Sequence, residues 1–536
     1  MESYNEQQLE AIESEERTIL CLAAAGCGKT KTLLGRVKRL IKQGADPKSI
    51  LCITFTNAAA FEMKERYKQL PGLDLSQGTP EFRTFHSFCY SLIVKDSAVR
   101  ERIGYSKIPE LCDDNTFKEI KTKVKFAIGC KLTDAQLDND VPLSRTQQEE
   151  KKLFQKALIK EIKKENVITF DIMCYNVCEL FTRGEECVDK YKQKYKYLMC
   201  DEMQDTDPKQ FKFIASFPET THFFMVGDVL QAIYAFRGCT NEFIKQLTVD
   251  PNWKVIKMFE NYRSTRQICE FANKFSTYSR DEYRIEMHGQ RDGEEPEVIY
   301  GSNSSYDYPV DRQHLKILVE KLQERKCESA ILCRTNRECN AVKGALSSAG
   351  IEYTARSKSS DVLNILHSAL SNEYMLGWLS TKLEAREYGD YIRLAAQDSN
   401  PDIRWFLTTY GNHEVIRKPA EKIIEIRNIT SDKSLKPADK FEKITKLLRI
   451  KTKCKFEGDD TSTNKEIVLS IRDQIQALED SQIYVGTVHS SKGLEYEAVY
   501  VMGVNDTMFK LGSEEMNNLA YVAFTRAKNY LTVFRT

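Results

Sequence analysis

Short apolar runs alternate along the chain with longer segments in which apolar and charged residues recur at helical spacing. Apolar runs of this length indicate strands buried on both faces, as in parallel sheets. The predicted strands form two groups, 18–22, 50–55, 196–200, 222–226 and 254–258, and then 330–334, 483–488, 498–502 and 531–535. The alternation predicts an α/β fold with two parallel sheets, each with helices on both faces.

Two long segments lack this rhythm and are predicted to be helical insertions. Residues 91–194 contain amphipathic, charge-rich stretches, and residues 371–475 are helix-like and rich in lysine. Gly, Pro, Ser and Asp cluster at 70–80, 284–310 and 456–465, which predicts loops.

Composition restricts the class of protein. The 536 residues are too many for one hydrophobic core, so three or four domains are expected. No window approaches the roughly 20 apolar residues of a membrane span, and the N-terminus is polar and acidic. We therefore expect a cytoplasmic protein, or a nuclear one if the source is eukaryotic, with no membrane partner. Because 79 basic residues balance 78 acidic ones, any nucleic-acid path must be local. The 16 cysteines form no CxxC pair or Cys–His block, which indicates reduced thiols.

The segment AAAGCGKT follows the first predicted strand and opens a helix-like segment. This context predicts a phosphate-binding loop, in which glycines let backbone N–H groups approach the phosphates. Lys29 adds a charge for the β and γ phosphates, and Thr30 offers a hydroxyl to Mg²⁺. The predicted loop residues are Ala23, Ala24, Ala25, Gly26, Cys27, Gly28, Lys29 and Thr30. Since Ala23 stands where the general pattern has glycine, a turn after an ordinary core strand is the alternative.

Two adjacent carboxylates, Asp201 and Glu202, follow a second strand-like run, YKYLMC. One carboxylate at such a strand end would hold the metal of a nucleotide, and the next would orient and deprotonate the attacking water. A solvated acidic turn is the alternative, but together with the phosphate loop the hydrolytic interpretation is favoured.

Nine motifs occur in order along the chain: 4–12 (YNEQQLEAI), 53–66 (ITFTNAAAFEMKER), 84–89 (TFHSFC), 201–207 (DEMQDTD), 226–238 (VGDVLQAIYAFRG), 260–268 (ENYRSTRQI), 331–342 (ILCRTNRECNAV), 487–503 (TVHSSKGLEYEAVYVMG) and 518–528 (NLAYVAFTRAK). The series resembles the UvrD/Rep/PcrA family of superfamily 1 helicases. The resemblance implies ATP between two RecA-like domains, single-stranded DNA or tailed duplex DNA as partner, and 3′-to-5′ movement. The implied domains are 1A at 1–90 and 195–256, 1B at 91–194, 2A at 257–370 and 476–536, and a reduced 2B at 371–475.

The resemblance also assigns roles at the ATP site. Gln8 would bind adenine, Gln231 would sense the γ-phosphate, and Tyr262 would stack on the base. Arg263 and Arg526 would reach the γ-phosphate, and Glu495 would contact the ribose. Asp201 would join Thr30 at Mg²⁺, with Glu202 as general base. A solvent-facing helical position is the alternative for Gln8 and for Arg526.

The implied DNA path combines stacking aromatics with hydrogen-bond donors to the backbone. The aromatic candidates are Phe55, Tyr234 and Phe236, with a buried core role as the alternative. The polar candidates are Thr56, Asn57, Thr84, His86, Arg237, Arg334, Asn336 and His489. His489 is expected to be a structural bridge rather than an acid or base.

Several positions depart from the family pattern. Ala58 replaces a lysine, Ala232 follows Gln231 where serine is common, and Asn517 and Asn518 stand where arginines are common. The sequence also ends directly after the last motif, without the tail of some relatives.

Three functions stay open: a stand-alone DNA helicase or translocase, a motor subunit of a nuclease complex such as the Gabija-type antiphage systems, and an ATP-gated binding module. Intact Glu202 and the two arginines argue against a merely structural protein.

Overall fold

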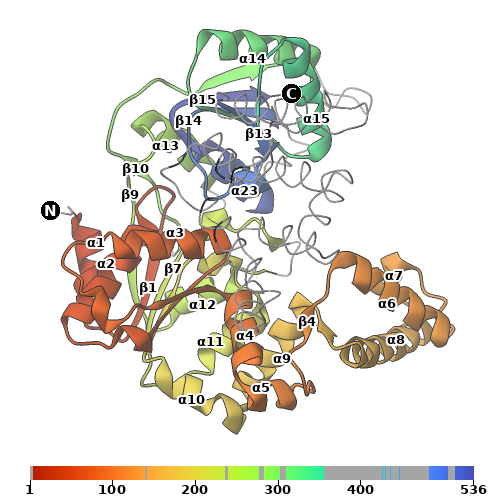
Figure 1. Cartoon of the computed structure of the whole chain (residues 1–536). Coiled ribbons are helices and arrows are strands. Elements are labelled where there is room, and N and C mark those ends of the chain that lie inside the picture. Colours follow the sequence, from red (N-terminus) through yellow and green to blue (C-terminus); the bar gives the residue numbers. More distant parts are fainter. Residues whose placement is uncertain are drawn as a thin grey trace. The chain divides into compact units, whose positions relative to one another are not determined.

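The computed structural model describes residues 4–138, 142–235, 239–276, 283–301, 310–354, 482–504 and 514–535, with isolated positions at 425, 429, 435, 443 and 446 (Figure 1). The chain divides into two compact units. Unit 1 comprises Met1–Ala23 and Gly28–Met258, and unit 2 comprises Ala24–Cys27 and Phe259–Thr536. Apart from the isolated positions, the insertion predicted at 371–475 lies outside the described residues, as does the loop predicted at 456–465.

A six-stranded sheet forms the centre of unit 1, in the order β3-β2-β6-β7-β1-β8. Its strands are β1 (Thr18–Ala23), β2 (Ile50–Thr54), β3 (Glu81–Thr84), β6 (Tyr197–Cys200), β7 (His222–Gly227) and β8 (Lys254–Met258). Every pairing is parallel. The sequence TILCLA of β1 is apolar at consecutive positions because this strand is buried on both faces. Since all strands run the same way, the segments that leave their carboxyl ends meet at one edge of the sheet.

Helices and short 3₁₀ turns connect these strands. They are α1 (Glu6–Glu13), α2 (Lys29–Lys42), α3 (Asn57–Lys68), α4 (Phe85–Lys95), α11 (Pro208–Ala215) and α12 (Glu242–Val249), with η1 (Pro47–Ser49), η2 (Leu75–Gln77), η3 (Met203–Asp205) and η4 (Val229–Gln231). Helix α2 packs against β7, and α3 packs against β2 and β3. Helix α1 lies on α2 and β8, which places the N-terminal motif beside the phosphate loop.

The predicted insertion at 91–194 is mainly helical. It contains α5 (Ser97–Arg102), α6 (Asp114–Ala127), α7 (Asp134–Asp138), α8 (Arg145–Lys164), α9 (Phe170–Arg183) and α10 (Glu186–Lys194), with the paired strands β4 (Glu110–Leu111) and β5 (Val167–Ile168). Ile120 and Val124 of α6 and Phe154 and Ile162 of α8 belong to one small core. Figure 1 shows α6, α7 and α8 beside one another. Among the described residues, no helix combines the length and the apolar character needed to span a bilayer.

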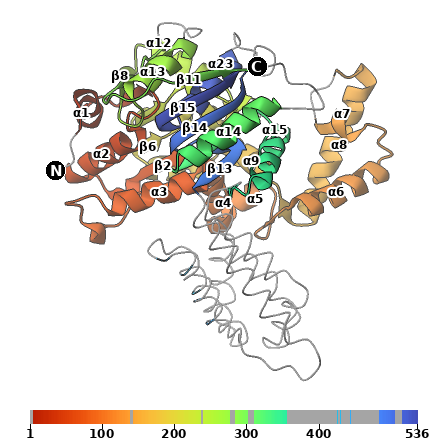
Figure 2. The same cartoon turned by 90° about the horizontal axis from the view of Figure 1, so that it is seen from above.

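Unit 2 has its own five-stranded parallel sheet, in the order β11-β15-β14-β12-β13. Its strands are β11 (Glu297–Tyr300), β12 (Ser329–Cys333), β13 (Ile483–Thr487), β14 (Tyr496–Val504) and β15 (Ala527–Arg535). Its other elements are α13 (Arg266–Asn273), α14 (Arg312–Glu324), α15 (Asn336–Ser348), α23 (Glu514–Phe524), η6 (Lys274–Ser276), η7 (His489–Ser491) and the strand pair β9 (Glu260–Asn261) and β10 (His288–Gly289). Figures 1 and 2 show α14 and α15, in green, beside the blue strands β13 and β14. One core joins Leu318 and Val342 of these helices to Val485 and Tyr500 of these strands.

The predicted fold class is confirmed: the protein is an α/β protein with two parallel sheets. All nine predicted strands are present. The prediction of a loop over 284–310 is wrong in part, because β10 and β11 lie within it. Strand β3 was not predicted, because its sequence EFRT lacks the apolar run of a central strand and it lies at the edge of the sheet.

Candidate functional site

The loop between β1 and α2 bends through two glycines in the left-handed region of backbone conformation. Gly26 has φ +70° and Gly28 has φ +82°, which side-chain-bearing residues rarely adopt. Gly28 is the N-cap of α2, so the backbone N–H groups of the first helical turn lie at the loop. A helix N-terminus preceded by such a loop is suited to bind a phosphate group.

Gln8 lies in the first turn of α1 and is only 2% exposed. Its backbone N–H donates to Asn5 Oδ1 at 2.8 Å, and Asn5 N–H donates to Gln8 Oε1 at 3.2 Å. A Cβ built on Gly28 would lie 2.8 Å from Gln8 Nε2, so this amide lies against the phosphate loop. The solvent-facing alternative for Gln8 is therefore wrong, whereas its contact with adenine stays a prediction.

The two predicted carboxylates follow β6, two strands away from β1 in the sheet. Thr30 Oγ1 donates to Asp201 Oδ2 at 3.1 Å, which brings the first turn of α2 to the end of β6. Burial, and next the charge of Glu202, raise the pKa of Asp201 to about 7, while the charge of Lys29 opposes the rise. Such a carboxyl is suited to lose its proton when a cation approaches.

The hydroxyl oxygen of Thr30 and the carboxylate oxygens of Asp201 fit Mg²⁺. This ion prefers oxygen ligands and often takes only one or two of them from the protein. In the part of the chain that the structure describes, no group of three or more His, Cys, Asp or Glu side chains is placed to hold a metal ion. A divalent ion at Thr30 and Asp201 would therefore complete its coordination with nucleotide oxygens and water.

Glu202 has an uncommon backbone conformation for a residue with a side chain. Its φ is +57°, in the left-handed region, and its N–H donates to Asp201 Oδ1 at 3.0 Å. Its carboxylate oxygen Oε2 accepts a hydrogen bond from Gln204 Nε2. Non-glycine residues in this region cluster at functional sites, where the surrounding structure holds them.

Gln231 reaches the same edge of the sheet from β7, which lies between β6 and β1. It is 4% exposed, and its Nε2 donates to Asp228 Oδ2 at 2.7 Å. Burial raises the pKa of Asp228, with the charge of Lys29 acting in the opposite direction. The parallel strands thus bring Lys29, Asp201 and Gln231 to one edge, although the sequence separates them widely.

The aromatic candidates Phe55 and Tyr234 stack on each other, with ring centroids 5.2 Å apart and planes at 19°. Both rings are half-buried, so a fully buried core role is wrong for either. Phe55 also lines a cleft of unit 1 together with His86, Asp201 and Glu202. One cleft therefore joins two DNA-path candidates to the two carboxylates. Phe236 and Arg237 lie outside the described residues, as does the side chain of Asn57.

The polar DNA-path candidates of unit 1 have structural partners. Thr56 Oγ1 accepts the N–H of Ala59 and caps α3, and Thr84 Oγ1 accepts the N–H of Ser87 and caps α4. His86 packs edge-on against Phe170, with ring centroids 5.7 Å apart. A hydrogen bond with Cys174 raises the pKa of His86, and burial opposes this effect.

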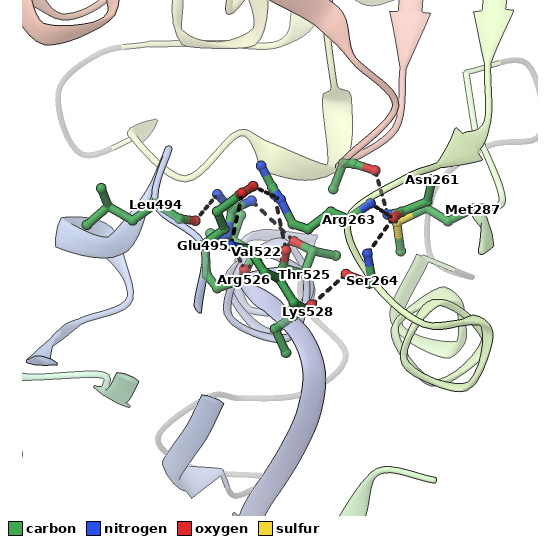
Figure 3. Close-up of polar contacts among 12 residues, drawn as sticks. Asn261, Arg263, Ser264, Met287, Leu494, Glu495, Val522, Thr525, Arg526 and Lys528 are labelled. Carbon is green, nitrogen blue, oxygen red and sulfur yellow. Dashed lines mark hydrogen bonds and ion pairs between the residues drawn. The ribbon is translucent and has the colours of Figure 1, made fainter. Parts of the chain in front are cut away.

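In unit 2, Arg263 and Glu495 form an ion pair, drawn in Figure 3. Arg263 Nε donates to Glu495 Oε2 at 2.6 Å, and Lys528 Nζ lies 3.4 Å from Glu495 Oε1. Although burial acts to raise the pKa of Glu495, the charges of Arg263 and Lys528 lower it overall. The neighbouring Tyr262 is 51% exposed. The structure thus unites two predicted ATP-site residues, Arg263 and Glu495, while leaving the Tyr262 ring accessible.

Arg526 is only 1% exposed, so its solvated-face alternative is wrong. Its guanidinium donates to backbone oxygens of Val522 at 3.0 Å and Leu494 at 3.2 Å, and to Thr525 Oγ1 at 3.3 Å (Figure 3). These bonds join the end of α23 to the turn before β14. Contact with a γ-phosphate stays a prediction.

The remaining candidates of unit 2 follow two neighbouring strands. Arg334 comes directly after β12 and is half-buried, and Asn336 begins α15 and is exposed. His489 follows β13 and is half-buried. Because Cys333 pairs with Thr487 in parallel register, Arg334 and His489 lie at the same edge of this sheet.

Sequence reasoning gave no role to Asn261, Gln204 or Asp228, which organise the candidate sites. Asn261 Oδ1 accepts the N–H of Arg263 at 2.8 Å and of Ser264 at 2.7 Å, and so shapes the turn that carries Tyr262 and Arg263 (Figure 3). An asparagine followed by a polar turn is a recognisable signal for this geometry. The Asp228 carboxylate makes local bonds to Leu230 and Gln231, whereas the bond from Asp228 N–H to Gln204 Oε1 joins residues 24 positions apart and leaves no local signal.

Comparison with known proteins covers both halves of the chain. Residues 4–252 match the UvrD/REP helicase N-terminal domain, and residues 256–363 and 389–536 match the UvrD-like helicase C-terminal domain. The ATP-dependent DNA helicase PcrA of Bacillus subtilis is 26% identical over 98% of this chain and 82% of the relative. The protein of the same name from Staphylococcus epidermidis is 24% identical over 99% of this chain and 83% of the relative. The chain therefore belongs to the UvrD-like family of helicases.

Proposed function

We propose that this helicase uses ATP hydrolysis to move 3′-to-5′ along single-stranded DNA and to unwind tailed duplexes. The match of both helicase domains across nearly the whole chain carries the proposal. The PcrA relatives are named as ATP-dependent DNA helicases and align with almost all of this sequence, which supports ATP and DNA as substrates here. We expect the protein to act in the cytoplasm.

The proposed domains follow the motifs. Residues 1–90 and 195–256 would form domain 1A, and residues 257–370 and 476–536 would form domain 2A. The helical insertion at 91–194 would be domain 1B, and residues 371–475 would be a reduced domain 2B.

In the proposed reaction, Lys29 and the N-terminus of α2 bind the phosphates of ATP. Mg²⁺, held by Thr30 and Asp201, would neutralise phosphate charge. Glu202 orients the attacking water and accepts its proton, since it lines the same cleft as Asp201 just beyond the end of β6. Gln231 senses the γ-phosphate from the end of β7, at the same edge of the sheet.

Arg263 and Arg526 are proposed to stabilise the charge that develops during phosphoryl transfer. The Asn261 turn and the Glu495 ion pair give Arg263 a defined position. Tyr262, which is exposed, is proposed to stack on the base of ATP.

The strand path is proposed to run over the stacked Phe55 and Tyr234, because half-buried aromatic rings offer faces to nucleic-acid bases. Phe55 and His86 share a cleft with Asp201 and Glu202, so occupancy of this path would be felt at the hydrolytic carboxylates. Stimulation of ATP hydrolysis by single-stranded DNA is the expected consequence.

The test is steady-state ATP hydrolysis with and without single-stranded DNA. We expect DNA to stimulate turnover, and Glu202→Gln to retain ATP binding but lose turnover by about three orders of magnitude or more, because the proton acceptor is gone. Glu219→Gln, which changes an exposed carboxylate of the same unit, is the matched control and keeps wild-type turnover. Normal turnover in Glu202→Gln would contradict the assigned base.

The same assay separates the alternatives. Turnover that needs an added protein, such as a nuclease subunit, would favour a motor subunit of a Gabija-type or similar complex. ATP-dependent DNA binding with very slow turnover would favour an ATP-gated binding module. Tailed duplexes with opposite polarity then establish the direction of movement.

A further inference from the structure

Gln204 lies in η3, two residues after the proposed base, and has no role in the reaction described so far. It is 1% exposed, although glutamine is usually found at the protein surface. A buried amide must have its donor and acceptor bonded, or it destabilises the fold. The partners of Gln204 therefore indicate what the residue does.

The two ends of the Gln204 amide bond to two different strand ends. Nε2 donates a hydrogen bond to Glu202 Oε2, beyond β6. Oε1 accepts the N–H of Asp228 at 3.0 Å, beyond β7. Gln204 thus ties the carboxylate of Glu202 to a backbone position on the neighbouring strand.

The surrounding packing leaves the amide little freedom. Strand β7 ends in Gly227, where an added Cβ would lie 3.0 Å from Gln204 Oε1 and 2.6 Å from Ile244 Cδ1. Because Gly227 has no side chain, the Gln204 amide fits beside it. Because the acceptor end is held by a rigid strand end, the donor end has a defined position relative to Glu202.

The bond partners extend from Glu202 to Gln231. Asp228, whose N–H binds Gln204, also accepts Gln231 Nε2 at 2.7 Å. Asp228 and Gln231 are both 4% exposed. One buried network therefore links the proposed base to the proposed γ-phosphate sensor.

We propose that Gln204 is a positioning residue, which orients the Glu202 carboxylate toward the attacking water through its amide N–H. The inference rests on the proposed function, in which Glu202 is the general base. A glutamate side chain has several rotamers, and the amide bond selects one of them before ATP binds. Preorganisation of this kind raises kcat rather than affinity for ATP.

Two substitutions separate the ends of the amide. Gln204→Glu keeps an oxygen that accepts the N–H of Asp228 but replaces the donor that faces Glu202. Gln204→Met has similar length and removes both functions. We expect both variants to lower kcat by about 10- to 100-fold, the usual effect of one hydrogen bond to a charged group. The KM for ATP and the affinity for single-stranded DNA should change less than about twofold.

If Gln204 only stabilised the turn at Asp228, a different result would be expected. Gln204→Glu would then keep the wild-type kcat, while Gln204→Met alone would lose activity and thermal stability. That outcome would overturn the proposal, as would a rise in KM for ATP at unchanged kcat.

A double substitution provides the control for the proposed base. Single-turnover hydrolysis by Glu202→Gln should fall no further when Gln204→Met is added, because a residue that acts through Glu202 has nothing left to position. A further tenfold loss would overturn the positioning role. Wild-type turnover in Glu202→Gln alone would refute the base itself, which is a result distinct from a failure confined to Gln204.

Discussion

Gly28→Ala should damage both the stability of the protein and its affinity for ATP. The backbone at Gly28 has φ +82°, where alanine costs about 1–2 kcal/mol relative to glycine. The added Cβ would also lie 2.8 Å from Gln8 Nε2, closer than a Cβ atom tolerates. Gln8 is held by its reciprocal bonds with Asn5, so its displacement should cost about 1 kcal/mol more.

Gly44→Ala is the matched control. Gly44 has φ +93°, and a Cβ built there meets no atom within 4 Å, so alanine brings the backbone cost without a clash. We expect the free energy of unfolding to fall by about 1–2 kcal/mol in Gly44→Ala and by about 2–3 kcal/mol in Gly28→Ala. Only Gly28→Ala should weaken ATP binding, by about tenfold, since its loop and Gln8 must shift.

Chemical denaturation gives the unfolding free energies, and titration with a fluorescent ATP analogue gives the affinities. In the Gln8→Ala background the clashing amide is already absent, so Gly28→Ala should lower the unfolding free energy by only about 1–2 kcal/mol relative to Gln8→Ala alone. Equal unfolding free energies for the two single glycine variants, with ATP affinity intact, would refute the close packing of Gln8 on the loop.

Two further predictions concern unit 1. Phe55→Ala should weaken binding of single-stranded DNA by about tenfold or more, because one stacking platform is lost. Phe61→Ala, which removes an exposed ring on α3, should leave this affinity unchanged. Equal affinities of the two variants in a fluorescence-anisotropy titration would exclude Phe55 from the DNA path. Burial acts to raise the pKa of Glu81, but hydrogen bonds from Lys194, Arg83 and Tyr195 lower it overall to about 2. The ionised carboxylate therefore stabilises the fold above its unfolded pKa near 4.3. This stabilisation is lost as the pH falls toward 2. Glu81→Gln should lower the unfolding free energy by about 1–2 kcal/mol at pH 7, and the difference from wild type should shrink between pH 5 and pH 2; a difference independent of pH would contradict this.

The sequence alone determined the fold class and the residue types of the proposed ATP site. Strands such as β1 and β12 are apolar at consecutive positions because both faces are buried, and this pattern is visible without knowledge of any partner. The glycines, Lys29 and Thr30 are adjacent in sequence, so the chemistry of the loop is also a local signal. Edge strand β3, with the sequence EFRT, lacks an apolar run, and edge strand β11, with the sequence EVIY, is only four residues long.

Only the tertiary structure decided which side chains meet. The strand order β6-β7-β1 brings Asp201 to Thr30 and places the amide of Gln204 between Glu202 and the end of β7. The packing of α1 on α2 and β8 places Gln8 against the phosphate loop. Arg526 looks like an ordinary helical arginine in sequence, yet it is enclosed by carbonyl oxygens. The physical reason is that hydrophobic periodicity reports whether a residue is buried, whereas hydrogen-bond partners depend on strand pairing between segments far apart in the chain.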